Sequence, residues 1–375
     1  MLYKNLVKKV SISPEMKTKQ KNYLEKGVLP IIDQGRDIIG GYTDNLNLQL
    51  SCSLPVIIFG DHTRAVKYID FPFGAGADGI KVLQPNEGIV PKYLYYATQY
   101  LVLRLEDRGY ARHYQYIEKK ELAVPDVEEQ KRIVAKIEEL FSELDNGVET
   151  LKKAKQQLAV YRQAVLKEAF DHISSKSDTH LIKDVCNNIK VGIVIKPAQY
   201  YTSEAEGIKA FRSANVREFH INNTDWVYLS KEGHSCNLRS EIHTGDVLIV
   251  RSGYPGTSCV VTDEYNGCNA IDILIAAPNV DVITPEYLCA FTNSPYGRKL
   301  ISEKKRGVAQ AHLNVGGYSQ MKIPVPDISA QHQVVKNIES DLSRCDNIEK
   351  TVDTALQQAE AMRQSILKKA FEGGL

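Results

Sequence analysis

Several loops of the sequence combine side chains of the types that contact nucleic acids. Residues 108–116 read RGYARHYQY and residues 304–314 read KKRGVAQAHLN, so each loop carries cations beside amide or imidazole groups. Cations bind phosphate, whereas Arg, Gln, Asn and His form directed bonds to base edges. With three further loops, the candidate DNA-contacting residues are Arg64, Arg108, Arg112, His113, Gln115, Arg212, Asn215, Arg217, Arg251, Lys305, Arg306, Gln310 and His312.

These residue types also have a purely structural use. A polar loop side chain is often solvated, or is bonded to the backbone of its own loop. The loops at Arg108-Gly109 and Arg306-Gly307 lie at equivalent places in the two halves of the chain. This recurrence favours a shared role in binding over loop decoration.

Three short motifs resemble catalytic or cofactor-binding sites without the context that such sites need. Residues 74–79 (GAGADG) match the dinucleotide-binding pattern, but IKVLQP follows where a helix must open. Residues 293–296 (NSPY) resemble an amino-methyltransferase box with Ser in place of Pro. Asp126, Glu129 and Lys131 mimic a nuclease motif, but fall within one helical turn. The histidines form no metal-binding pair. We therefore expect no catalytic residue, no metal and no cofactor in this chain.

The composition excludes a uniformly basic coat and a membrane-spanning chain. The 375 residues are 43% hydrophobic and 25% charged, with a net charge of +1, so DNA binding requires local patches. No apolar run approaches the roughly 18 residues of a membrane span, and the N-terminus lacks the apolar core of a signal peptide. The seven cysteines are scattered without a CxxC pair, which argues against disulfides and zinc. We expect a cytoplasmic protein.

An internal repeat supplies the elements that must position these loops. Residues 124–170 align without a gap on residues 325–371, at a constant offset of 201 and with roughly 20 identities in 47 positions. Asp126 and Asp327 suit the N-caps of two long helices, and Glu129 completes a capping box in the first copy. A helix of ~44 residues is about 65 Å long.

Apolar residues recur every seven positions along both copies, which predicts a coiled-coil seam. The expected interface residues are Ile133, Ile137, Leu144, Leu151, Leu158, Val165, Ile338, Val352, Ala359 and Ile366, with Cys345 in the same series. Leu140, Ala154, Tyr161, Val334, Ile348, Ala355 and Met362 fill interleaved positions, and Gly147 interrupts the seam. Because an isolated helix would leave its seam exposed to water, we expect the two copies to pair with each other. The alternative is two unrelated helices that each cover their own domain.

A mixed, β-leaning region precedes each helix, so the sequence predicts an α+β protein with an internal pseudo-twofold repeat. Each region has short β-branched runs followed by a Pro-started helix, PKYLYYAT at 91–98 and PEYLCAFT at 285–292. The predicted domains are 1–123, a spacer helix at 124–172, a second domain at 173–324 and a second spacer helix at 325–375. Two similar frames with different loops suggest a device that reads two different things at a fixed separation.

The duplicated segment resembles the specificity (S) subunit of type I restriction–modification systems. The resemblance is carried by VPDVEEQKRIVAKIEEL, YRQAVLKEAF and their second copies, and by FPFGAGADGIKVL and GDVLIVRSG in the domains. It covers essentially the whole chain. The second helix start departs from the family pattern, with Ala330 before Gln331.

The resemblance implies two mixed α/β target recognition domains, each reading half of an interrupted, bipartite DNA sequence. The two helices would pack as an antiparallel coiled coil that sets the spacing and docks two methylation (M) subunits. Those partners would bring S-adenosylmethionine and methylate adenine at N6. Separate motor–nuclease (R) subunits would use ATP and Mg. The chain itself would be non-catalytic and would hold no cofactor.

Two other functions stay open from the residues alone. One is a coiled-coil adaptor that binds only proteins, and the other is a self-contained DNA methyltransferase or nuclease. DNA binding tested across salt separates the adaptor from a DNA reader. Binding of S-adenosylmethionine or a divalent metal by the isolated chain would favour the enzyme.

Overall fold

The chain forms two compact units in the computed structural model. The structure describes residues 1–375 except 77–78, 107–108, 110, 175–176, 306–311 and 375. Unit 1 comprises Met1–Lys152 and Asp353–Leu375, and unit 2 comprises Lys153–Val352. Each unit therefore combines one mixed domain with parts of two long helices, α3 (Val127–Ser174) and α9 (Ile328–Glu372).

Unit 1 contains two small sheets. The first has the order β1-β8-β5-β6, in which all neighbouring strands are antiparallel. Its strands are β1 (Val7–Val10), β5 (Val56–Gly60), β6 (Val66–Ile69) and β8 (Ile80–Pro85). The second sheet has the order β2-β7-β3-β4, with strands β2 (Lys17–Thr18), β3 (Leu29–Ile32), β4 (Gly41–Thr43) and β7 (Gly74–Gly76). Every residue of β5 is buried, because sheet neighbours and side-chain layers cover both of its faces.

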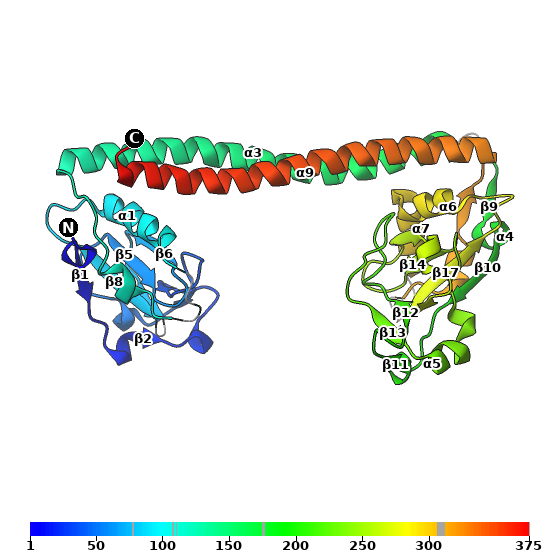
Figure 1. Cartoon of the computed structure of the whole chain (residues 1–375), viewed down its shortest axis with the longest axis horizontal. Coiled ribbons are helices and arrows are strands. Elements are labelled where there is room, and N and C mark those ends of the chain that lie inside the picture. Colours follow the sequence, from blue (N-terminus) through cyan, green and yellow to red (C-terminus); the bar gives the residue numbers. More distant parts are fainter. Residues whose placement is uncertain (77–78, 107–108, 110, 175–176, 306–311, 375) are drawn as a thin grey trace. The chain divides into compact units, whose positions relative to one another are not determined.

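Helix α1 (Pro91–Leu103) lies between the first sheet and the long helices in unit 1 (Figure 1). Tyr93, Leu94, Ala97 and Leu101 share one core with Ile57 and Phe59 of β5 and with residues of the long helices. The short helix α2 (Tyr114–Ile117) completes this unit. Pro91 suits the first helical position, where its missing N–H costs no hydrogen bond.

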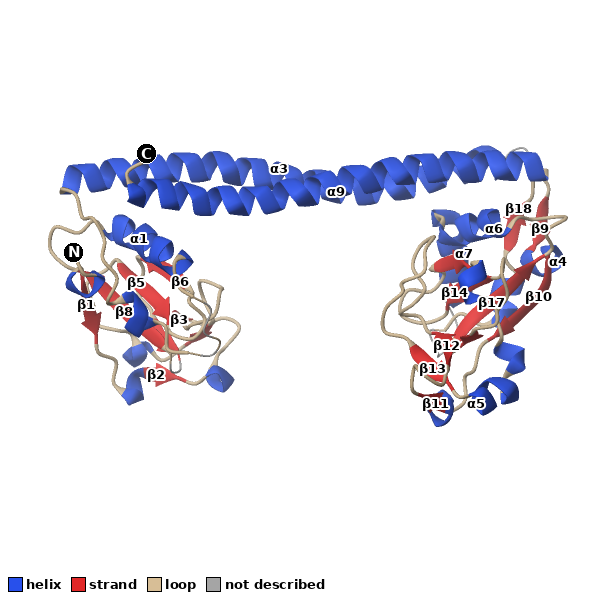
Figure 2. Ribbon diagram, in the orientation of Figure 1, coloured by secondary structure: helices blue, strands red, loops and turns tan. Residues whose placement is uncertain are grey.

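Unit 2 repeats the plan of the first sheet. The order β10-β17-β14-β15 is again fully antiparallel, with strands β10 (Cys186–Val191), β14 (Val247–Val250), β15 (Ser258–Val260) and β17 (Ile273–Pro278). The second sheet is β11-β13-β12-β16, with β11 (Tyr201–Thr202), β12 (Ile208–Phe211), β13 (Val227–Leu229) and β16 (Asn269–Ala270). Strands β9 (Thr179–Leu181) and β18 (Lys322–Pro324) form a short antiparallel pair. The helices are α4 (Ile182–Val185), α5 (Lys231–Cys236), α6 (Pro285–Asn293), α7 (Pro295–Lys305) and α8 (Val315–Ser319) (Figure 2).

The repeated Pro-started helices, α1 and α6, are anchored by matching bonds. Tyr93 Oη donates to the Ala123 carbonyl at 2.8 Å, and Tyr287 Oη donates to the Pro324 carbonyl at 2.9 Å. Thr98 and Thr292 each bond the carbonyl four residues back, at 2.7 and 2.8 Å. The two segments PKYLYYAT and PEYLCAFT therefore form equivalent helices with the same anchoring bonds in the two units. This equivalence confirms the predicted α+β fold with an internal repeat.

Both long helices begin as predicted. Asp126 Oδ1 accepts the Glu129 N–H at 2.9 Å, and Asp327 Oδ1 accepts the Ala330 N–H at 2.8 Å. The capping box is only half formed, because both carboxylate oxygens of Glu129 bond Arg132, and this bonding lowers the pKa of Glu129.

The long helices pair antiparallel within each unit. In unit 1 the end of α9 meets the start of α3: Arg363 pairs with Asp145, and Ile366 packs in the same core as Ile133. In unit 2 the start of α9 meets the end of α3, where Arg162 lies 2.6 Å from Asp346 and 3.0 Å from Glu349. The antiparallel coiled coil is thereby confirmed.

The seam is narrower than the heptads predicted. All ten expected interface residues are buried or half-buried, and Ile137 and Ile338 are almost fully enclosed. Three interleaved residues are wrongly placed by the prediction, since Tyr161, Ile348 and Met362 are about half exposed. A straight helix drifts by ~20° per heptad, which carries one flank of a wide stripe toward solvent. Beside Gly147 the seam leaves an apolar cavity of about 360 Å³ in unit 1.

No described helix is long and apolar enough to cross a membrane.

Candidate nucleic-acid interface

Two hairpin turns occupy the same place in the repeated sheet. Residues 61–65 join β5 to β6, and residues 251–257 join β14 to β15. They carry two of the predicted cations, Arg64 and Arg251. Arg64 adopts a φ of 61°, a left-handed conformation that non-glycine residues rarely adopt. The shared topology therefore brings candidate cations to matching positions of the two units.

In unit 1, the buried residue Asp61 holds the loop before α2 against this turn. Its Oδ1 accepts the Tyr114 N–H at 2.8 Å, and its backbone carbonyl accepts the His113 N–H at 2.8 Å. The same carbonyl lies 3.0 Å from His113 Nδ1. Lys81 Nζ balances the carboxylate at 3.3 Å. The loop is thus fixed beside the turn that carries Arg64.

His113 is a correction to the predicted site. Its side chain is 1% exposed and bonds the protein backbone, so it supports the loop and cannot face a DNA duplex. Arg112 on the same loop and Gln115 in the first turn of α2 are exposed, and Gln115 Nε2 donates to the Arg112 carbonyl at 3.0 Å. These two side chains keep their place as candidates. Arg108 lies outside the described residues.

Unit 2 joins its turn to the corresponding loop by different side chains. Arg251 Nε donates to the Leu313 carbonyl at 2.9 Å, and its NH1 lies 2.5 Å from Asp272 Oδ1. Ser252 Oγ lies 2.5 Å from His312 Nδ1. Arg251 is therefore committed to holding two loops together, whereas His312 is exposed beside it. Lys305 is the last residue of α7, and its side chain lies outside the described part of the structure. Arg306 and Gln310 lie outside the described residues altogether.

The loop of residues 212–224 contains a second correction. Asn215 is fully buried, where its Oδ1 accepts the Arg212 N–H at 3.0 Å and its Nδ2 donates to the Thr224 carbonyl at 2.8 Å. It shapes the loop and does not read bases. Arg212 is half-buried and bonds the Asp225 carbonyl. Arg217 is exposed, and its NH1 donates to the Ser213 and Val216 carbonyls at 3.3 and 3.0 Å.

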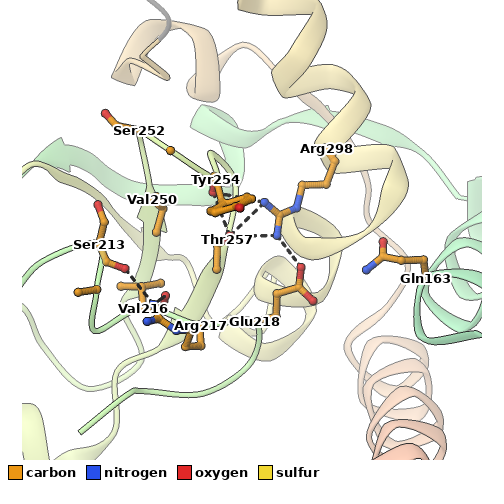
Figure 3. Close-up of a pocket in the computed structure, with 12 residues that line it drawn as sticks. Gln163, Ser213, Val216, Arg217, Glu218, Val250, Ser252, Tyr254, Thr257 and Arg298 are labelled. Atoms are coloured by element: carbon orange, nitrogen blue, oxygen red, sulfur yellow. Dashed lines mark hydrogen bonds and ion pairs between the residues drawn. The ribbon is translucent and has the colours of Figure 1, made fainter. Parts of the chain in front are cut away.

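A groove of about 820 Å³ lies between this loop and the turn of residues 251–257 (Figure 3). Its lining includes Arg217, Ser252, Tyr254 and Arg298, with Gln163 contributed by α3. Tyr254 is 84% exposed, so its ring is free to stack on a partner. The exposed groups include the Arg217 guanidinium and the Tyr254 ring, which are groups that bind the backbone and bases of a nucleic acid, and also the Glu218 carboxylate, whose charge Arg298 pairs.

Arg298 on α7 lies at the back of the groove and faces the protein. Its NH2 donates to Glu218 Oε1 at 2.8 Å, and its NH1 donates to the Pro255 carbonyl at 2.9 Å. Both terminal nitrogens lie 3.2 Å from Thr257 Oγ1. Burial lowers the pKa of Arg298, and the Glu218 carboxylate opposes this shift.

Unit 1 has a comparable buried cation in Lys67. Its side chain is 4% exposed, and its Nζ donates to the Asp33 carbonyl at 2.8 Å and lies 3.6 Å from Asp33 Oδ1. Burial lowers the pKa of Lys67, against the opposing effect of Asp33. Lys67 thereby ties β6 to the loop after β3. No sequence pattern singles out Lys67 or Arg298, because each is a single cation without a recurring motif around it.

Comparisons with known proteins lead to the same family that the duplicated segment resembles. The family model described as the type I restriction modification DNA specificity domain matches residues 10–159. The chain is 27% identical over 275 residues to the type I restriction enzyme EcoBI specificity subunit of Escherichia coli, covering 68% of this chain and 58% of that protein. It is 26% identical to the EcoKI specificity subunit of Escherichia coli strain K12, covering 68% and 57%. The matched region thus spans less than two thirds of the length of these relatives.

A solved structure extends the likeness to the whole fold. A chain in a study of complex assembly and conformational transition of the type I R-M system matches with a TM-score of 0.71. The match covers 100% of this chain and 97% of that chain at 17% identity, so it concerns the fold. The duplicated helices, the family model and the relatives in sequence agree: this chain is similar to the type I restriction–modification specificity subunits.

Proposed function

We propose that this chain is the sequence-specific DNA-recognition subunit of a type I restriction–modification complex. Unit 1 reads one half of an interrupted, asymmetric DNA target and unit 2 reads the other half. The chain itself catalyses no reaction and holds no cofactor. It acts in the cytoplasm on double-stranded DNA.

One observation carries this proposal. The two units share one strand order and matching anchors for α1 and α6, but the loops at the same end of the sheet differ in length and in most of their residues. Each turn carries one arginine, Arg64 or Arg251, but Asp61 accompanies it in unit 1, whereas Ser252 and Tyr254 accompany it in unit 2. A repeated frame with different contact residues suits a protein that reads two different half-sites, since base contacts specify sequence while the scaffold positions them.

The long helices support the partner side of the proposal. An antiparallel pair of matching helices presents similar surfaces at its two ends, which suits two copies of one partner. We propose that two methylation subunits dock there, bring S-adenosylmethionine and methylate adenine at N6. Motor–nuclease subunits, which use ATP and Mg, join the same complex.

Selection from a random DNA pool tests the DNA-reading role. The full chain is mixed with duplexes carrying a randomised segment, and the bound fraction is sequenced. We expect a two-part motif with a fixed unread spacer, and an affinity that falls steeply with salt because phosphate contacts release counterions. A chain that binds no duplex at any salt is instead a protein-binding adaptor. Binding of S-adenosylmethionine by the chain alone would favour a self-contained methyltransferase.

A further inference from the structure

The two walls of the groove in unit 2 are joined by one side chain at its back, Arg298. Loop 212–224 and turn 251–257 form its two walls, and helix α7 stands behind them. Arg298 projects from α7 and bonds both walls, Glu218 on one side and Thr257 on the other (Figure 3). Its NH1 also donates to the Pro255 carbonyl at 2.9 Å. The guanidinium therefore links the two walls, which a backbone bond from the Phe219 N–H to the Ser258 carbonyl, at 3.0 Å, also joins just beyond the turn.

The donors of Arg298 are already occupied by the protein. NH1 faces Pro255 and Thr257, and NH2 faces Glu218 and Thr257, with Asn293 Oδ1 a further 3.4 Å neighbour of NH2. The side chain is 25% exposed, against 84% exposure for the residue Tyr254. Arg298 is thus committed to the walls and not directed at a bound molecule.

The turn also lies tightly against α7. Gly256 has a φ of 89°, and a Cβ at this position would come 2.4 Å from Ile301 of that helix. The φ of 89° favours glycine at this position, and a Cβ would also require the end of the Ile301 side chain to move. The turn is therefore seated on α7 by contact at Gly256, while the hydrogen bonds from Arg298 hold the adjacent residues Pro255 and Thr257 and tie the turn to Glu218.

We propose that Arg298 is a positioning residue for DNA reading by unit 2: it fixes the groove whose walls present Arg217, Ser252 and Tyr254 to the edge of the duplex, an inference that rests on the proposed function. A planar guanidinium suits this task, because it bonds several acceptors in one fixed geometry where an ammonium acts as a point charge. Base readout requires donors placed to within fractions of an ångström. A groove wall held less firmly should therefore lower discrimination between base pairs before it lowers overall affinity for DNA.

The test is selection from a randomised duplex pool by full-length Arg298→Gln and wild type. We expect the variant to lose about 10- to 100-fold of its preference for one half of the motif, the size of one or more good base contacts. Preference for the other half and the salt slope should stay unchanged, because Arg298 touches no phosphate. Glu218→Gln, a milder change at a half-exposed side chain, should weaken the same half-site by a smaller factor.

The double variant distinguishes positioning from loss of folding. If Arg298 acts through the wall at Glu218, the two changes should be less than additive in their effect on that half-site. Arg344→Gln is the matched control, since Arg344 also pairs with a carboxylate in unit 2, at 3.0 Å, but lies on α9. It should leave the motif intact.

The outcomes separate this inference from the proposed function. A two-part motif that Arg298→Gln leaves unchanged overturns the positioning role alone. An equal loss on every duplex, with a salt slope reduced by about one, makes Arg298 a phosphate contact and also overturns it. Equal loss of both half-sites in both single variants shows general unfolding and overturns it as well. A wild-type chain that enriches no sequence overturns the proposed function and this inference with it.

Discussion

Two glutamines of the repeat, Gln130 and Gln331, join the long helices to the domains through buried hydrogen bonds, and their replacement tests this attachment directly. Gln331 is fully buried: its Oε1 accepts the Thr284 N–H at 2.9 Å, and its Nε2 donates to the Val282 and Pro326 carbonyls, both at 2.9 Å. Gln130 makes the same three kinds of bond in unit 1, at 2.8 to 3.0 Å. Each side chain therefore joins the first turn of a long helix to the loop before α1 or α6.

Replacing either glutamine by alanine should strongly destabilise its own unit. Three backbone groups lose their partner in a site with little access to water. At about 1 kcal/mol for each bond, and more for a group that stays dry, the free energy of unfolding should fall by about 3–5 kcal/mol. Loss of the neighbouring cap in Asp327→Ala should cost only about 1 kcal/mol, because that end of the helix is solvated.

Amide hydrogen exchange of the full chain measures this effect one unit at a time. Gln331→Ala should reduce the protection of the Thr284 amide by about 150- to 5,000-fold and leave the Val90 amide in unit 1 unchanged. Gln130→Ala should do the reverse. Gln333→Ala is the matched control, since Gln333 is exposed and its side chain donates to Asn337 Oδ1 on the same helix, at 2.8 Å. Protection that falls no further in Gln331→Ala than in this control would refute the role of the glutamine.

Three further predictions concern the core, the pH response and the interface. Phe170→Ala should lower the free energy of unfolding of unit 2, and Phe371→Ala that of unit 1, by about 3–5 kcal/mol in denaturant titration, because each ring packs on the tyrosine of a repeated helix. Burial raises the pKa of Asp246, so the folded state binds its proton more tightly than the unfolded state; relative to Asp246→Asn, wild-type thermal stability should fall as pH rises from the ordinary aspartate pKa through the raised one. Arg112→Ala should alter selection of one half-site and Arg217→Ala the other, and equal loss on all duplexes would mark both as backbone contacts.

The helices were predictable from sequence because their signals are local and repeated. A cap at Asp126 or Asp327, a proline-free run and a seven-residue period together define a helix start and its buried stripe. The flank of the seam was not predictable. Whether Tyr161 or Met362 is covered depends on how far the stripe has drifted around the helix by that point, and on what else packs there, which no local pattern records.

The candidate interface was predictable only as a set of loops. His113 and Asn215 have the residue types of base-reading side chains, but both bond the protein backbone, His113 at Asp61 of the neighbouring turn and Asn215 within its own loop. Composition cannot distinguish a polar group that faces solvent from one that a buried carbonyl or N–H already satisfies. Arg298 was missed for the opposite reason: its partners are far away in sequence, at Glu218 and Pro255, so only the fold brings them together.

The positions that the repeat preserves explain how one chain carries two different reading surfaces. Each long helix carries a glutamine in its first turn, bonded to one domain, and a phenylalanine near its end, packed on the other domain. In α3 these residues are Gln130 in unit 1 and Phe170, which packs against Tyr287 at 5.4 Å between ring centroids. Helix α9 runs from Gln331 in unit 2 to Phe371 against Tyr93, at 5.2 Å. Every domain is therefore held by the start of one helix and the end of the other. Because these anchors leave the turns after β5 and β14 uninvolved, those turns are free to differ without loss of the frame.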